Sequence, residues 1–89
     1  MELSDKVVVI TGAAGGIGSA CARRFAVEGP RRLVCADLDG EAAERVAAEV
    51  NRATGSTVAV GRACDVGREA EVQALIDEVS AADGTIDLY

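Results

Sequence analysis

The chain alternates short apolar runs with longer amphipathic stretches. A nearly unbroken apolar run at residues 6–11 predicts a strand that is buried on both faces. Similar runs predict a second strand at 33–36, ending at Asp37, and a third at 57–64. A fourth strand begins at 86–89. We therefore expect strands at four places, each separated from the next by a stretch long enough for a helix.

The first of these stretches, residues 16–28, predicts a helix that Gly29-Pro30 ends. Its apolar face is expected at Ile17, Cys21 and Phe25, with Ala20 beside them. A second helix is predicted over 41–52, with Asp39 as its cap, and a third over 68–81. Both show apolar residues at i, i+3, i+4 and i+7, namely Ala43, Val46, Ala47 and Val50, and Val72, Leu75, Ile76 and Val79.

This order of elements predicts an α/β fold with a parallel sheet, because parallel strands need helical crossovers between them. It is the βαβαβα order of a Rossmann-type, doubly wound parallel sheet, incomplete and followed by the start of a fourth strand. No linker, repeat or low-complexity segment interrupts residues 1–89. We expect one unit with the sheet order 3-2-1-4.

Composition narrows the choice of partners. The formal net charge is −6 and no basic stripe is present, which argues against nucleic acid. No apolar run approaches the about 18 residues of a membrane span, and no signal peptide is seen, so we expect a cytoplasmic protein without a membrane partner. Three cysteines, Cys21, Cys35 and Cys64, without any histidine argue against a metal site or a disulfide framework.

The main candidate for chemistry is a glycine cluster between the first strand and the first helix. Gly12 would permit a tight turn, Gly16 would let phosphates approach the backbone, and Gly18 would let the helix pack closely. The N–H groups from Ala14 to Ile17, with the helix dipole behind them, would face an anion. The pattern predicts a site for a dinucleotide pyrophosphate.

Two acids stand where such a site needs them. Asp37, about twenty residues past the glycines, would accept the hydroxyls of the adenosine ribose. It would repel a 2′-phosphate, and neither Ala14 nor Leu38 is a cation, so NAD is favoured over NADP. Asp37 could instead only turn its loop. Asp65, followed by Val66, could accept the adenine amino group or cap the next helix.

Several motifs together resemble the short-chain dehydrogenase/reductase family across essentially all 89 residues. Thr11 to Gly18 resembles its TGxxxGIG signature, residues 36–39 its NAD-selective strand end, Asp65-Val66 its adenine-contacting pair, and residues 84–88 its lead-in to the fourth strand. The resemblance implies a usually dimeric or tetrameric oxidoreductase that transfers hydride between NAD(H) and an alcohol or ketone. The predicted cofactor-binding residues are Gly12, Ala14, Gly15, Gly16, Ile17, Gly18, Asp37, Leu38, Asp65 and Val66.

The family's catalytic residues have no counterpart here, so no catalytic residue is predicted. The family uses a Ser, a Tyr and a Lys four positions after that Tyr, whereas this chain has one Tyr, Tyr89, and one Lys, Lys6. Its single Asn, Asn51, falls on a predicted helix and not after the fourth strand. We expect the amino-terminal, NAD(P)-binding part of such an enzyme, inactive by itself.

Two other functions fit the pattern less well. An S-adenosylmethionine-binding, methyltransferase-like domain also places acids after its second and third strands. Its glycine loop usually follows an acid, however, where this chain has Thr11. A free-standing nucleotide-binding module without catalysis is the other alternative, although an incomplete sheet would leave the apolar run at 7–10 at an edge.

Overall fold

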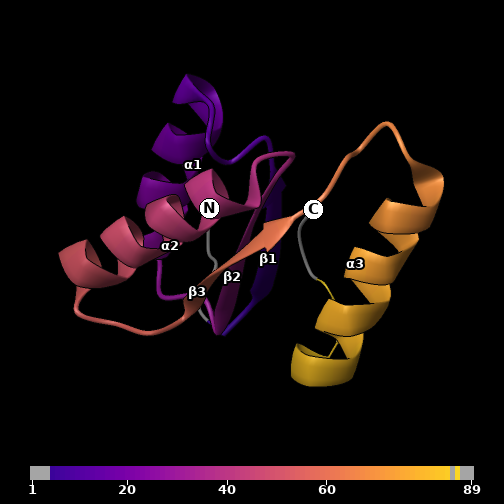
Figure 1. Cartoon of the computed structure of the whole chain (residues 1–89). Helices are drawn as coiled ribbons and strands as arrows, with labels where there is room; N and C mark the ends of the chain where they lie inside the picture. Colours follow the sequence, from indigo (N-terminus) through magenta and orange to yellow (C-terminus); the bar gives the residue numbers. More distant parts are fainter. Residues whose placement is uncertain (1–4, 85, 87–89) are drawn as a thin grey trace.

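The structure, a computed structural model, describes residues 5–84 and 86 (Figure 1). Its elements in chain order are β1 (Val7–Thr11), α1 (Gly16–Ala26), β2 (Arg32–Asp37), α2 (Gly40–Thr54), β3 (Ala59–Ala63) and α3 (Glu69–Asp83). The strands form a parallel sheet in the order β1-β2-β3. The predicted α/β class is confirmed, as is the 3-2-1 part of the expected strand order.

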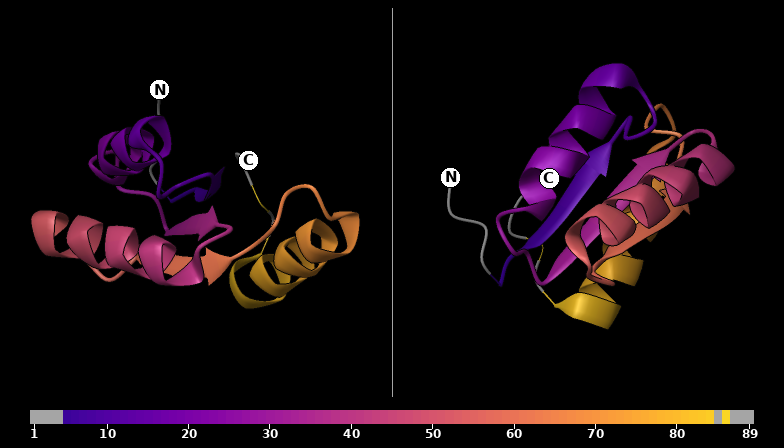
Figure 2. Two further views of the ribbon diagram at one scale, coloured as in Figure 1. Left: turned by 45° about the horizontal axis from the view of Figure 1, so that its top comes forward. Right: turned by 90° about the vertical axis from the view of Figure 1, so that its left-hand side faces the viewer.

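The helices form a layer on each side of the sheet. α1 and α2 lie on one face and α3 lies on the other (Figure 2). Successive side chains of a strand point to opposite faces, so β1 sends Val8 and Ile10 into the α1–α2 layer, and Val7 and Val9 into the α3 layer. Both faces are covered, which explains why β1 is apolar at consecutive positions.

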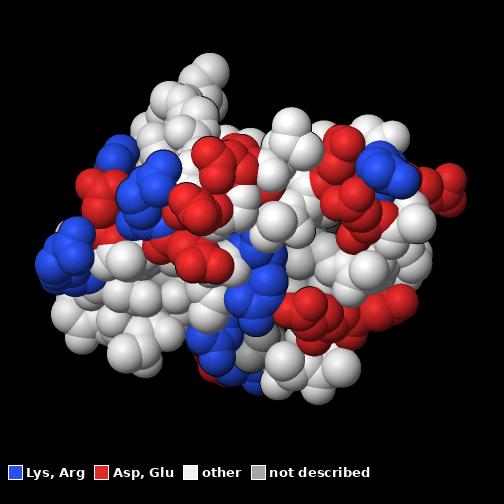
Figure 3. All heavy atoms as spheres, in the orientation of Figure 1, with Lys and Arg blue, Asp and Glu red and all other residues white. Residues whose placement is uncertain are grey.

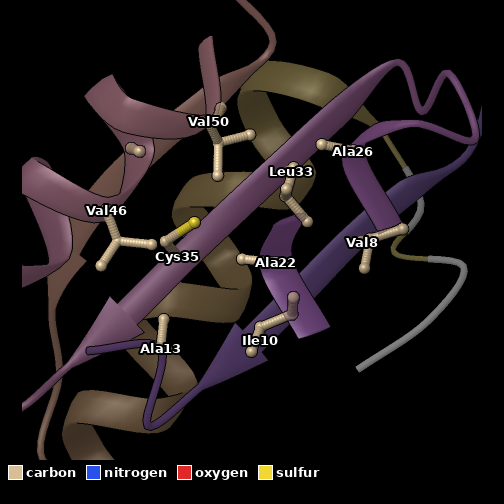
Figure 4. Close-up of a cluster of buried hydrophobic side chains, with 11 residues drawn as sticks. Val8, Ile10, Ala13, Ala22, Ala26, Leu33, Cys35, Val46 and Val50 are labelled. Carbon is tan, nitrogen blue, oxygen red and sulfur yellow. The ribbon is translucent and has the colours of Figure 1, made fainter. Parts of the chain in front are cut away.

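The larger core lies between the sheet and the two helices on its face (Figure 4). Leu33 and Cys35 of β2 are fully buried there beneath Val46 and Val50 of α2. A second core on the α3 face joins the other strand side chains to Leu75 and Val79. The two cores hold the strands in register and so hold their carboxyl ends side by side.

The second helix forms as its sequence predicts. Asp39 accepts a hydrogen bond from Ala42 N at 3.1 Å and so caps the first turn. The predicted stripe is buried in full: Ala43, Val46, Ala47 and Val50. Gly55 ends the helix with φ +67°, a left-handed conformation that suits glycine. In the third helix Leu75 and Val79 are buried, whereas Val72 and Ile76 are half-buried.

The expected apolar face of the first helix is wrong in part. Ile17 is 84% exposed and Ala20 is exposed, whereas Ala22 and Ala26 are the buried residues of α1. Cys21 and Phe25 pack against the core from its margin. The helix lies against β1, β2 and α2, and its buried residues are alanines, which give a weaker hydrophobic signal than the Ile17 that we placed on this face.

The outer edge of β3 is covered by one side chain of α2. Asn51 donates from Nδ2 to Ala59 O at 2.9 Å and accepts from Ala59 N at its Oδ1, also at 2.9 Å. Its carboxamide thus pairs with the strand as a neighbouring strand would. The strand itself is shorter than predicted, beginning at Ala59 rather than at residue 57.

The structure also bears on the expected fourth strand, on membrane spans and on the cysteines. Of the expected fourth strand at 86–89, Ile86 packs against the α3-side core, and the remainder lies outside the described residues. No helix in the described part of the chain is long and apolar enough to span a membrane. Cys35 and Cys64 are buried and Cys21 is half-buried, all as free thiols.

Candidate cofactor-binding site

The residues predicted to bind a cofactor gather at one edge of the sheet. The glycine turn follows β1, Asp37 is the last residue of β2, and Asp65 follows β3 by two positions. Because the three strands are parallel, their carboxyl ends meet at the same edge, where ligands of open α/β sheets bind. The register aligns Thr11 with Ala36, and Asp37 with Ala63.

The glycines of the turn have distinct roles. Gly12 has φ +65° and its carbonyl accepts from Gly15 N at 3.1 Å, which closes a tight turn. A Cβ on Gly18 would lie 2.9 Å from Ala13 Cα and closer still to the Gly12 carbonyl, so the helix could not approach the turn with a side chain there. A Cβ on Gly16 would meet nothing within 4 Å. The space in front of Gly16 is open.

Backbone donors at the start of α1 lie beside this space. Gly16, Ile17 and Gly18 are its first three residues, and N–H groups of a first helical turn have no acceptor within the helix. Ala14 and Gly15, in contrast, donate to Asp37 and Gly12. Two of the four N–H groups that we expected to face an anion are therefore engaged inside the chain. The N–H groups of Gly16 and Ile17 remain candidates for binding an anion.

Asp37 accepts hydrogen bonds from backbone N–H groups through both carboxylate oxygens and through its main-chain carbonyl. Its Oδ2 accepts from Ala14 N and its Oδ1 accepts from Asp39 N, both at 3.0 Å. Its main-chain carbonyl accepts from Cys64 N at 2.8 Å. The side chain thus turns the loop after β2, as the alternative interpretation held, and also contacts the glycine turn. The contact with Ala14 spans 23 residues and left no signal in the sequence.

Asp65 does not cap α3. Its Oδ1 accepts from Gly67 N at 2.9 Å, and α3 begins after Arg68 without a side-chain cap. Glu71 of the first helical turn accepts from Asp65 N at 3.0 Å and pairs with Arg68 at 3.6 Å. Sequence reasoning missed Glu71, although an acid three residues after the N-cap often bonds back to the N-cap N–H; here the bond reaches three residues farther, to Asp65.

Three apolar side chains around this edge are exposed to solvent. Ile17 is 84% exposed, Leu38 74% and Val66 60%. Each follows a different strand of the sheet. Such exposure, at the start of α1 and in the loops after β2 and β3, is typical of a surface that a ligand covers.

A groove beside the glycine turn brings in a residue that sequence reasoning overlooked. Ala14 lines it together with Arg45 and other residues of α2. The two positions next to the expected ribose, Ala14 and Leu38, carry no positive charge. Arg45 lies five residues after Gly40, the first residue of α2, and the fold brings it beside Ala14, so no spacing in the sequence indicated it.

Burial accounts for the state of the thiols. It raises the pKa of Cys35 to about 11. Burial also raises the pKa of Cys64, aided by the negative charges of Glu71 and Asp65. Both thiols are therefore protonated at neutral pH, which makes them poor nucleophiles. Among residues 5–84 and 86, no group of three or more His, Cys, Asp or Glu side chains could hold a metal ion.

A parallel sheet with a glycine turn at a helix start and an acid at the end of the second strand defines a dinucleotide-binding class of α/β protein. The family model of the short chain dehydrogenases matches residues 6–89. The chain belongs to the short-chain dehydrogenase family. This membership removes the methyltransferase-like alternative.

Relatives and solved structures agree with this assignment. The chain is 47% identical over 87 residues to the uncharacterized oxidoreductase YuxG of Bacillus subtilis and 44% identical to D-threitol dehydrogenase of Mycolicibacterium smegmatis. Each match covers 98% of this chain, but 12% and 32% of the respective relatives. A short-chain dehydrogenase/reductase of Burkholderia phymatum, solved in complex with NAD, superimposes with a TM-score of 0.85 at 40% identity. That match covers 99% of this chain and 31% of the other.

Proposed function

We propose that this chain is the NAD-binding part of an oxidoreductase that transfers hydride between NAD(H) and an alcohol or ketone. The observation that carries the proposal is that the glycine turn, Asp37 and Asp65 meet at one edge of the sheet, with open space before Gly16 and exposed apolar side chains at the same edge. NAD supplies the hydride chemistry when bound. Residues 1–89 would then form part of a single NAD(P)-binding Rossmann domain.

In this proposal, different residues of the site contact the pyrophosphate, the ribose and the adenine of the cofactor. The N–H groups of Gly16 and Ile17, at the positive end of the α1 dipole, would hold the pyrophosphate. Asp37 would accept the ribose hydroxyls, because a carboxylate has about four lone-pair positions and backbone donors occupy two of them. Leu38 and Val66 would cover the adenine, with Asp65 beside its amino group.

Asp37 also supports NAD over NADP. A carboxylate at this position repels a 2′-phosphate. Arg45, one of two arginines that line the neighbouring groove with Ala14, works in the opposite direction. It has no ion-pair partner within the described residues. The preference for NAD therefore depends on how the two charges balance at the ribose.

Measuring NAD and NADP affinity by calorimetry tests this proposal. The wild type should bind NAD more tightly, and Asp37→Ala should lose most of that preference, because both the hydroxyl acceptor and the repulsive charge are removed. Arg45→Ala is the matched control and should weaken NADP more than NAD. If Asp37→Ala kept the preference for NAD, the ribose role of Asp37 would be wrong.

Catalytic turnover by this chain is a question separate from cofactor binding. The family's catalytic Ser, Tyr and Lys have no match in residues 1–89. Our expectation that the 89-residue chain does not oxidise NADH by itself stays a prediction. NADH oxidation by the chain with any carbonyl substrate would contradict it.

A further inference from the structure

We infer that Asp37 shapes the phosphate-binding turn as well as recognising the ribose. Its role in the turn rests on the proposed function, because the turn is taken to bind the cofactor's pyrophosphate. Asp37 Oδ2 accepts from Ala14 N at 3.0 Å across a separation of 23 residues. This bond joins the end of β2 to the middle of the glycine turn.

The turn needs such a restraint. It contains four glycines between positions 12 and 18, and glycine loses more conformational freedom on ordering than any other residue. The other hydrogen bonds that hold its start are main-chain bonds, from Ala13 N to Ala36 O at 3.0 Å and from Gly15 N to Gly12 O at 3.1 Å. Ala14, which lies between these donors, is held by the carboxylate of Asp37.

The carboxylate is itself held in position. Asp39 N donates to its other oxygen at 3.0 Å, and the Asp37 carbonyl accepts from Cys64 N at 2.8 Å. The first bond ties the side chain to the loop after β2, and the second ties the Asp37 main chain to the residue that follows β3, so Asp37 links the glycine turn to the edge of the sheet. A turn held ready before binding costs less to order when phosphates arrive. Asp37 is a positioning residue for the pyrophosphate.

The two roles of Asp37 can be separated with a nucleotide that lacks ribose hydroxyls. We propose measuring the affinity for 2′,3′-dideoxyadenosine 5′-diphosphate. If Asp37 recognises only hydroxyls, Asp37→Ala should leave this affinity unchanged, or raise it by removing a negative charge near the phosphates. If Asp37 shapes the turn, the affinity should fall about tenfold, the loss that corresponds to one hydrogen bond of a charged group. The direction in which the affinity for the dideoxy nucleotide changes therefore distinguishes the two roles of Asp37.

Hydrogen exchange at the Ala14 amide gives a readout that needs no ligand. The amide should be protected in the wild type and exposed in Asp37→Ala. Asp39→Ala is the matched control, because its carboxylate caps α2 and does not contact the turn, so Ala14 should stay protected. Protection of Ala14 in Asp37→Ala would overturn the inference.

A second variant covers the case in which Asp37→Ala fails to fold. Asp37→Asn keeps one acceptor oxygen and removes the charge. Across the variants that fold, affinity for the dideoxy nucleotide should follow protection of the Ala14 amide, and separation of the two would overturn the inference. A wild type with a protected Ala14 amide that binds neither NAD nor the dideoxy nucleotide would count against the proposed function instead.

Discussion

At the scale of single residues, Gly16 and Gly18 are separated by one position but face different surroundings. Gly18 lies against the backbone of the turn, whereas Gly16 faces open space. Their positions and types were evident from the sequence, as was the tight turn at Gly12. The contact of Asp37 with Ala14 was not, because it depends on how the turn folds back toward β2. A motif indicates which residues matter but not how they bond to one another.

This contrast predicts different results for two alanine substitutions. Gly18→Ala should lower the free energy of unfolding by about 1–3 kcal/mol or more, since backbone atoms cannot move away from the added methyl group. Gly16→Ala should leave stability unchanged or slightly raised, because alanine is the better helix former. It should nevertheless weaken NAD binding, since its methyl group enters the space before the turn.

Urea unfolding and NAD calorimetry on both variants check this prediction. Equal stability losses would show that the turn can adjust around residue 18. Unchanged NAD affinity in Gly16→Ala would show that no ligand approaches the turn at residue 16.

At the scale of elements, the i, i+3, i+4, i+7 pattern predicted the buried face of α2, alanines included, whereas the four-residue spacing in α1 did not predict its buried face. The stripe of α2 was predicted in full. The face of α1 was assigned partly to Ile17, whereas Ala22 and Ala26 are the buried residues. Ile17 lies instead at the edge of the candidate site. Its apolar side chain therefore belongs to a candidate binding surface and not to the core. Periodicity alone could not separate these two reasons for an apolar residue.

The contact between Asn51 and β3 leads to a prediction about stability. Asn51→Ala removes both 2.9 Å hydrogen bonds with Ala59 and should lower the free energy of unfolding by about 1–3 kcal/mol. The higher helix propensity of alanine offsets less than about 0.7 kcal/mol of this loss. Urea denaturation measures the effect.

The matched control is Arg52→Ala, an exposed position on the same helix. It should change stability by less than about 0.5 kcal/mol. Equal effects of the two substitutions would mean that the Asn51 contact contributes nothing beyond helix propensity.

At the scale of the whole molecule, the parallel sheet collects groups from distant parts of the chain at one edge. The order of elements was enough to predict this, since parallel strands bring their carboxyl ends together. The distribution of surface charge says less about where the site lies. Figure 3 shows acidic and basic side chains interspersed on one face, with acidic groups prominent over α3. The candidate site is therefore defined by backbone donors, two placed carboxylates and exposed apolar side chains.

The most direct test of the central claim is to titrate NAD into the ¹⁵N-labelled protein and follow its amide resonances. We predict saturable shifts centred on Gly16, Ile17, Leu38 and Val66, at the carboxyl edge of the sheet. Amides at the opposite edge, near Gly29 and Gly55, should not move. No saturable change, or changes centred on that opposite edge, would contradict the account.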